Sequence, residues 1–156
     1  MRKYFLILGM MSILLSGLSC DSRMVYDKFE PTEHGMWSWQ DIKEFHAEIT
    51  DTVSMYNIYL QVRHTVDYPM SNLYMFVHVK SPSGQQMTDT VNMVLAVPDG
   101  RWTGKGNGYI RELMLLYRKQ TRFRIPGTYV FSLEQAMRQS ELPVTDLGVR
   151  IERINP

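Results

Sequence analysis

The chain of 156 residues contains a single cysteine, Cys20, so no disulfide can form within it. Its stability must therefore come from packing and hydrogen bonding. Charges of one sign are not in excess either, since 17 lysines and arginines stand against 16 aspartates and glutamates. Such a balance lacks the basic footprint of nucleic-acid binding, and we expect no nucleic-acid partner.

Long apolar runs are also scarce, and the single long one lies at the N-terminus. Residues 4–18 are almost entirely apolar, Arg2 and Lys3 precede them, and small residues lead into Cys20. The run is shorter than the roughly 20 residues of a transmembrane helix, which favours a cleaved signal. We predict a lipoprotein signal peptide over residues 1–19 and lipidation of Cys20. An ordinary secretory cleavage nearby is the alternative.

The rest of the chain has the length of one domain with its own core. Cleavage would remove two of the 17 basic residues and no acidic one, which leaves a net charge of −1. Residues 20–41 are mixed and polar without a sustained period, and we interpret them as a lipidated tether. We assign residues 42–156 to a single domain.

Within that domain, apolar and polar residues alternate with the period of half-buried strands. Residues 109–125 would also suit a helix, but the glycines before them and Pro126-Gly127 after them favour a strand. Good helix formers at 134–139 predict one short helix. Short strands separated by glycine and proline turns indicate an all-β fold, a β-sandwich or its jelly-roll form. The predicted strands include 45–49, 56–63, 73–79 (covered on both faces), 92–97, 109–125, 129–133 and 149–154.

The sequence gives no positive case for catalysis. The run Gly104-Lys105-Gly106-Asn107-Gly108 has the look of a phosphate loop, but it lacks the preceding strand and following helix, so we expect a hairpin turn. The histidines at 34, 46, 64 and 78 lack the spacing that fixes two metal ligands together. No serine lies in a Gly-x-Ser-x-Gly elbow. We expect no catalytic residue, no metal and no cofactor.

Aromatic and basic residues are the candidates for an interaction surface. Trp37 and Trp39 lie two apart, so in an extended backbone they point the same way, either onto the core or as an exposed platform. Arg63 and His64 must point to opposite faces of their strand, so one faces inward unless the strand ends there. Trp102 would cover an open end of the sandwich. The predicted surface comprises Trp37, Trp39, Arg63 and Trp102.

A series of short stretches extends from the signal to the last predicted strand. They are Asp51-Thr52, Tyr56-Asn57-Ile58, Leu60, Arg63-His64, Tyr68-Pro69, Ser71-Asn72-Leu73, Leu95-Ala96, Gly100-Arg101-Trp102-Thr103-Gly104, Gly106, Gln135-Ala136-Met137-Arg138, Leu142 and Asp146-Leu147-Gly148-Val149-Arg150-Ile151-Glu152. In this order, and behind the lipoprotein signal, they resemble the GldH family of gliding-motility lipoproteins of the Bacteroidetes.

The resemblance implies a membrane-anchored, cell-envelope component of the gliding machinery, which is tied to protein secretion across the outer membrane. Its partners would be other envelope proteins of that machinery, on the outer-membrane or periplasmic side. The family has no established enzyme activity, so no catalytic residue is carried over. A surface glycan-binding module is the first alternative, with tryptophans stacking on sugar rings. An envelope hydrolase is the second, and it requires a pocket with convergent polar groups.

Overall fold

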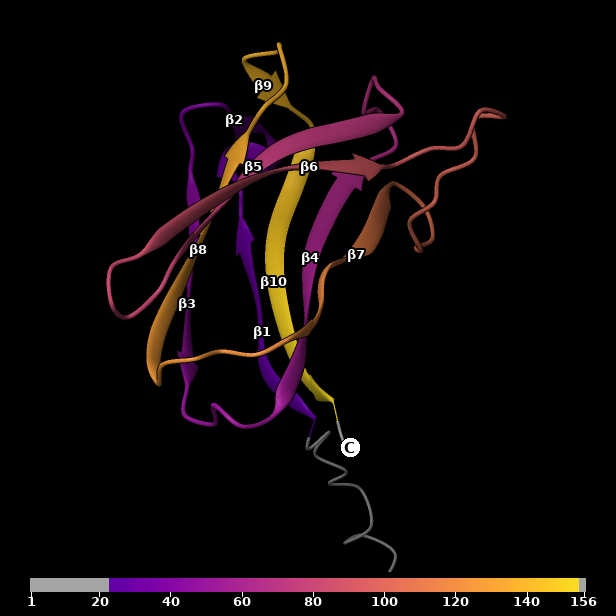
Figure 1. Cartoon of the computed structure of the whole chain (residues 1–156). Coiled ribbons are helices and arrows are strands. Elements are labelled where there is room, and N and C mark those ends of the chain that lie inside the picture. Colours follow the sequence, from indigo (N-terminus) through magenta and orange to yellow (C-terminus); the bar gives the residue numbers. More distant parts are fainter. Residues whose placement is uncertain (1–22, 155–156) are drawn as a thin grey trace, which may run out of the picture.

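The computed structural model describes residues 23–154, and these form strands joined by turns and loops (Figure 1). The described part contains no α-helix, only one turn of 3-10 helix, η1 (Glu33–Gly35). The strands are β1 (Met24–Pro31), β2 (Trp37–Ser38), β3 (Lys43–Ile49), β4 (Met55–Thr65), β5 (Asn72–Lys80), β6 (Gln86–Val94), β7 (Ile110–Thr121), β8 (Gly127–Gln135), β9 (Glu141–Leu142) and β10 (Val144–Ile154).

Two four-stranded antiparallel sheets make up the fold, in the orders β1-β10-β4-β7 and β3-β8-β5-β6, and β2 pairs with β9 beside them. Counted along the chain, the eight long strands lie in the orders 1-8-3-6 and 2-7-4-5. This arrangement is that of a jelly roll. Period-two patterning therefore led to the correct fold class.

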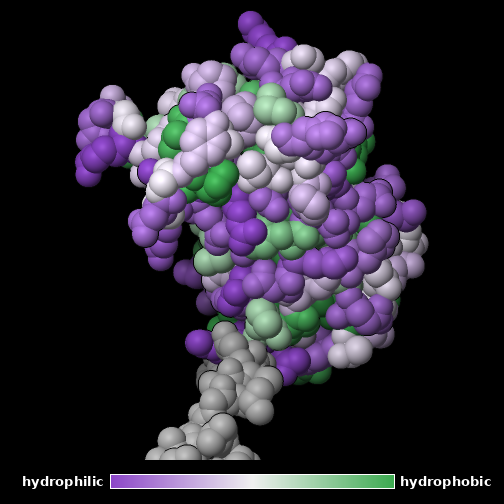
Figure 2. Space-filling model, turned by 180° about the vertical axis from the view of Figure 1, so that it is seen from behind, coloured by the Kyte–Doolittle hydropathy of each residue, from purple (hydrophilic) through white to green (hydrophobic). Residues whose placement is uncertain are grey.

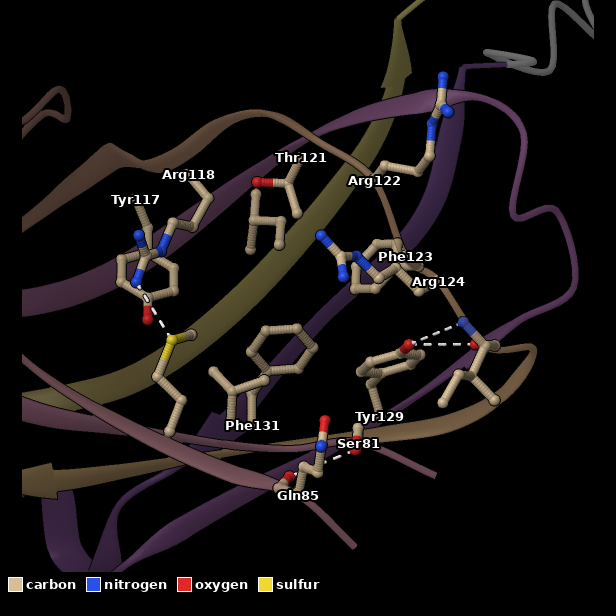
Figure 3. Close-up of a pocket in the computed structure, with 14 residues that line it drawn as sticks. Ser81, Gln85, Tyr117, Arg118, Thr121, Arg122, Phe123, Arg124, Tyr129 and Phe131 are labelled. Atoms are coloured by element: carbon tan, nitrogen blue, oxygen red, sulfur yellow. Dashed lines mark hydrogen bonds between the residues drawn. The ribbon is translucent and has the colours of Figure 1, made fainter. Parts of the chain in front are cut away.

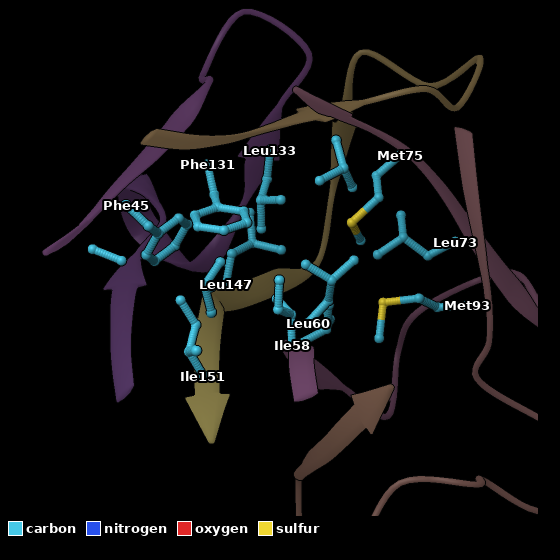
Figure 4. Close-up of a cluster of buried hydrophobic side chains, with 14 of the residues drawn as sticks. Phe45, Ile58, Leu60, Leu73, Met75, Met93, Phe131, Leu133, Leu147 and Ile151 are labelled. Atoms are coloured by element: carbon cyan, nitrogen blue, oxygen red, sulfur yellow. The ribbon is translucent and has the colours of Figure 1, made fainter. Parts of the chain in front are cut away.

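The core lies between the two sheets, where the inward side chains of both interdigitate (Figure 4). In β3 the burial alternates strictly, with Phe45, Ala47 and Ile49 fully buried. In β8 Phe131 and Leu133 are buried in the same way. Because side chains alternate between the faces of a strand, this pattern places one face of each sheet on the core.

The short helix predicted at 134–139 was wrong. Glu134 and Gln135 are the last residues of β8, where they pair with Phe76 and Met75 of β5. The N–H of Ala136 extends this ladder by donating to the Tyr74 carbonyl over 3.0 Å. Tertiary pairing therefore overrides the local helix propensity.

Two further expectations need correction. Strand β5 is not covered on both faces, since Tyr74 is exposed and Phe76 is half-buried. The sheet begins at Met24 rather than after residue 41, because β1 pairs with β10 over most of its length. This edge strand has no period-two burial, which is why its sequence resembled a tether. The predicted signal peptide and the predicted lipidation site, Cys20, lie outside the described residues.

The sandwich has two ends that differ in what they carry. At the terminal end, which comprises residues 23–24, 50–55, 119–127 and 153–154, the Arg153 N–H donates to the Arg23 carbonyl over 2.7 Å. The far end comprises residues 32–41, 63–71, 95–112 and 136–146. Figure 1 shows the ends of β1 and β10 together below, with the β2 and β9 pair and several loops above.

Candidate functional site

All four residues predicted as an interaction surface lie at the far end, but they are not equally accessible. Trp37 is fully buried. Its indole N–H donates to the Asp41 carbonyl over 2.7 Å, and its own carbonyl accepts the Gln135 side-chain amide over 2.9 Å. Trp37 is therefore a core residue whose polar groups are satisfied within the fold.

Trp39 lies differently, with 55% of its surface exposed. The expectation that the two tryptophans point the same way was wrong, because β2 ends at Ser38 and the chain turns. The N–H of Asp41 donates to the Ser38 carbonyl over 3.0 Å and closes this turn. The period-two argument holds only while the backbone stays extended.

Arg63 is held on the outer face of β4 by neighbours on both sides. Its Nε donates to Glu112 Oε2 of β7 over 2.7 Å, and its guanidinium lies 3.9 Å from the ring centre of Phe29 on β1. These contacts leave the guanidinium partly exposed in a fixed orientation. Such a preordered arginine suits recognition of a partner, because little side-chain entropy remains to be lost on binding.

His64 points inward and is fully buried, which agrees with the prediction that Arg63 and His64 point to opposite faces of their strand. Its Nδ1 lies 2.8 Å from the Thr65 carbonyl and must carry the hydrogen, since a carbonyl only accepts. Its ring lies 4.7 Å from that of Trp102 and 5.5 Å from that of Tyr68. Burial lowers the pKa of His64, which favours a neutral ring. This histidine supports the end of the sandwich from within.

Tyr68 and Trp102 extend this support to two loops. The Tyr68 hydroxyl donates to the Asn72 carbonyl over 3.0 Å, and burial raises its pKa. Trp102 forms a β-bridge with Ala96 and packs partly buried on the core. The interpretation that Trp102 covers an open end of the sandwich agrees with this position.

The glycine-rich run 104–108 is a hairpin turn, as expected. Lys105 and Glu112 exchange backbone hydrogen bonds of 2.8 Å in both directions, and β7 follows as a strand. Gly106 has φ of 137°, a region that L side chains rarely adopt. At the same loop the Tyr109 hydroxyl donates to the Asp67 carboxylate, and this hydrogen bond raises the pKa of Tyr109. The loop is thereby tied to residues 66–71.

The far end therefore presents ordered, partly exposed groups rather than a reaction centre. The accessible groups are Arg63, Trp39 and Tyr109, whereas His64 is buried. Within residues 23–154, no three His, Cys, Asp or Glu residues are grouped to hold a metal ion. Helices long and apolar enough to cross a membrane are likewise absent from this part of the chain.

A cavity of about 450 Å³ lies between the sheets towards the terminal end, and sequence reasoning did not identify it. In Figure 3 the rings of Phe123, Tyr129 and Phe131 line it, Arg124 reaches toward it and Arg122 points away. Its described lining contains no histidine, cysteine or carboxylate. The available signal was the alternation of basic and aromatic residues over 117–124.

Beside this cavity, Asp89 of β6 joins the two sheets by accepting hydrogen bonds from Tyr117 and Arg118 of β7. The Tyr117 hydrogen bond lowers the pKa of Asp89, whereas burial raises the pKa of Tyr117 to about 12. These are the roles of a structural clamp, since the carboxylate stays ionised and the phenol stays protonated. With apolar walls and an arginine rim, the cavity has no acid–base pair.

Comparison with known proteins gives a consistent result over nearly the whole chain. The family model described as GldH lipoprotein matches residues 24–151. A protein of Christiangramia forsetii named "Gliding motility lipoprotein GldH homolog" is 31% identical over 98% of both chains. "Gliding motility lipoprotein GldH" of Flavobacterium johnsoniae is 32% identical over 94% of both chains.

Among solved structures, the infectious bursal disease virus VP2 subviral particle aligns with 85% of this chain and 32% of the viral chain. The TM-score is 0.29 and the sequence identity 12%. A similarity this low adds no argument about fold or function.

Proposed function

The chain belongs to the GldH lipoprotein family, and from this premise we propose that it is a lipid-anchored component of the gliding-motility machinery that works by contact rather than catalysis. Cys20 would carry the lipid. Its role in the machinery would include the associated protein secretion. Other envelope proteins of the same machinery would be its partners, and they would bind at the far end.

The observation that carries this proposal is the separation of the two ends. Cys20 lies three residues before Arg23, so a lipid at Cys20 would hold the terminal end within about 11 Å of the attachment point. Strand β4 has 11 residues and connects the two ends, which places the far end roughly 35 Å farther away. The far end would therefore project from the membrane toward soluble or membrane-bound partners.

The chemistry of the far end favours contact over catalysis. Hydrolysis needs a nucleophile or base that can reach substrate, oriented by a further group. His64 is fully buried, and its Nδ1 is engaged by the Thr65 carbonyl. Arg63, by contrast, is partly exposed, ordered and stacked on Phe29. Arginine and aromatic residues of this kind often dominate protein interfaces.

Glycan binding is the less favoured alternative because the aromatic residues do not form a platform. Stacking on sugar rings would require several exposed rings in a row. Trp37 is buried, Trp102 packs partly buried against His64, and only Trp39 of the three is exposed. This arrangement supports a protein partner instead.

Affinity isolation of tagged variants from membranes tests the proposal. We would compare Arg63→Ala, Trp39→Ala and Tyr109→Ala with Tyr74→Ala, an exposed aromatic on the outer face of β5. Loss of a central anchor should weaken recovery of a partner by more than about 2 kcal/mol, roughly 30-fold, and should impair gliding or secretion. Tyr74→Ala should recover the partner normally.

Unfolding measurements on each variant must accompany the isolation, because a destabilised domain would also lose its partner. The proposal would fail if one exposed histidine or carboxylate abolished function while folding and every partner contact stayed intact. That outcome would favour a hydrolase.

A further inference from the structure

Three basic side chains at the terminal end have no acidic partner in the fold. Lys119, Arg122 and Arg124 are exposed, and no carboxylate among residues 23–154 forms an ion pair with them. Their neighbour Arg118 differs, since it is bonded to Asp89. Exposed charges left unpaired by the fold are available to an external anion.

Thr121, which lies between Lys119 and Arg122 in the sequence, is level with the point where the described chain begins at Arg23. Thr121 pairs with Tyr56, Tyr56 pairs with Arg153, and the Arg153 N–H donates to the Arg23 carbonyl. This row crosses the sheet from β7 to β1. Three strand spacings of about 4.8 Å put Thr121 about 14 Å from the start of β1.

Apolar side chains are exposed at this end as well. Val53 shows 79% of its surface, and Met24, Met55 and Ile125 are also exposed. Figure 2 shows hydrophobic surface among hydrophilic groups at the end where the described chain begins. Exposed apolar groups next to basic ones are typical of surfaces that rest in a membrane interface.

The acidic residues near this end are engaged by the protein itself. Asp51 accepts hydrogen bonds from Ser54 and lies 3.4 Å from Arg153. Glu48 accepts the Thr128 hydroxyl over 2.6 Å. Glu48 keeps its negative charge and is exposed, because a hydroxyl does not neutralise a carboxylate, but Lys119, Arg122 and Arg124 outnumber it, so the exposed charge at the terminal end is predominantly positive.

We propose that the terminal end rests on the leaflet that holds the lipid anchor, with Lys119, Arg122 and Arg124 contacting anionic headgroups and Val53 and Ile125 entering the interface. The anchor would keep this end at the surface, and the basic residues would fix its tilt. Each basic residue near an anionic membrane strengthens binding about fivefold, so the three together should contribute roughly 100-fold.

The test uses the acylated protein reconstituted into vesicles of phosphatidylcholine, with or without phosphatidylglycerol. In this account Cys20 carries the lipid, so Val53→Cys introduces the only free thiol, and Asn107→Cys does the same at the far end. A fluorophore at residue 53 should be quenched by brominated lipid when phosphatidylglycerol is present, and high salt should reverse the quenching. The fluorophore at residue 107 should be quenched little in any vesicle.

A charge-matched pair of variants separates local contact from net charge. Changing Lys119, Arg122 and Arg124 to Glu should abolish the quenching at residue 53. Changing Arg101, Lys105 and Arg138 to Glu alters the net charge equally at the far end and should leave the quenching in place. Equal quenching in both variants would overturn the proposal.

Two other results would also overturn it. Quenching at residue 53 that ignores phosphatidylglycerol would mean that the basic residues contact no headgroup. A fluorophore exposed to water on vesicles but protected in native membranes would mean that a protein covers this end. Recovery of far-end partners is measured separately, so neither result would by itself affect the proposed function.

Discussion

The far end and the terminal end of the sandwich are built on the same strands but differ in the groups that surround their basic side chains. At the far end Arg63 is paired with Glu112 and Arg101 with Asp99, and a buried histidine and two aromatic rings support the loops. Exposed basic residues without an ion pair occur at both ends of the described chain, but at the terminal end Lys119, Arg122 and Arg124 lie close in sequence, near the exposed Val53 and Ile125. Strand pairing therefore fixes the scaffold, whereas the loops decide what each end can contact.

The orientation of the two ends relative to the membrane depends on the lipid at Cys20. Among the variants considered, Cys20→Ser should therefore have the largest effect. Without the lipid, membrane retention should be lost, because three basic contacts and a few apolar side chains give only reversible binding. Fractionation with fatty-acid labelling measures this. Unlabelled protein that stays wholly in membranes, in cells lacking its envelope partners, would contradict lipidation at Cys20.

Trp37→Ala should have the next largest effect, because it removes a large buried side chain below the far end. We expect the free energy of unfolding to fall by about 3–5 kcal/mol. Urea unfolding measures the loss. A change below about 1 kcal/mol would show that the far end is not supported through Trp37.

Titratable groups at the two ends should affect the free energy of unfolding in different pH ranges. Burial lowers the pKa of His64 from its ordinary value of 6.5. As the pH falls, the unfolded chain therefore binds a proton at this histidine before the folded chain does. The free energy of unfolding should therefore be unaffected by this group above about pH 6.5 and should fall as the pH drops below it. His64→Phe should remove this slope, and equal slopes in both proteins would rule it out.

At the terminal end the corresponding group is Asp51. Hydrogen bonds from Ser54 and Val53 lower its pKa from 3.8 to about 2. Its stabilising contribution should be complete above the ordinary pKa and should be lost as the pH falls from about 4 to 2. Asp51→Asn should flatten this acid region and leave the region near pH 6 unchanged. Unfolding curves over both ranges measure the two effects.

Trp39→Ala should have the smallest effect on stability. Its ring is exposed, so the free energy of unfolding should change by less than about 0.5 kcal/mol. A loss as large as that of Trp37→Ala would show that both tryptophans are structural, and the far end would then lose its exposed aromatic.

How much of this was predictable from the sequence depends on the length over which a pattern persists. Alternation in 45–49, 56–63 and 129–133 gave the correct strands, because burial on one face enforces it. The helix at 134–139 failed, since pairing of β8 with β5 outweighs propensity. Trp37 and Trp39 separate at a turn that a period of two cannot show.

The residues that meet at the cavity and around the basic side chains could not be predicted from the sequence for a different reason. Both depend on which strands become neighbours: Tyr117 and Arg118 meet Asp89 only because β7 and β6 face each other across the sheet edge. The position of Thr121, beside these basic residues in the sequence, about 14 Å from the start of β1 likewise follows from a row across four strands. Pairing partners of this kind are not encoded in local periodicity.

Photo-crosslinking in intact cells tests the central claim most directly, namely that the far end meets proteins while the terminal end meets lipid. A photoreactive amino acid would replace Trp39 in one variant and Val53 in another, with all other residues unchanged. We predict protein adducts from position 39 and lipid adducts from position 53. Protein adducts from position 53 together with none from position 39 would contradict it.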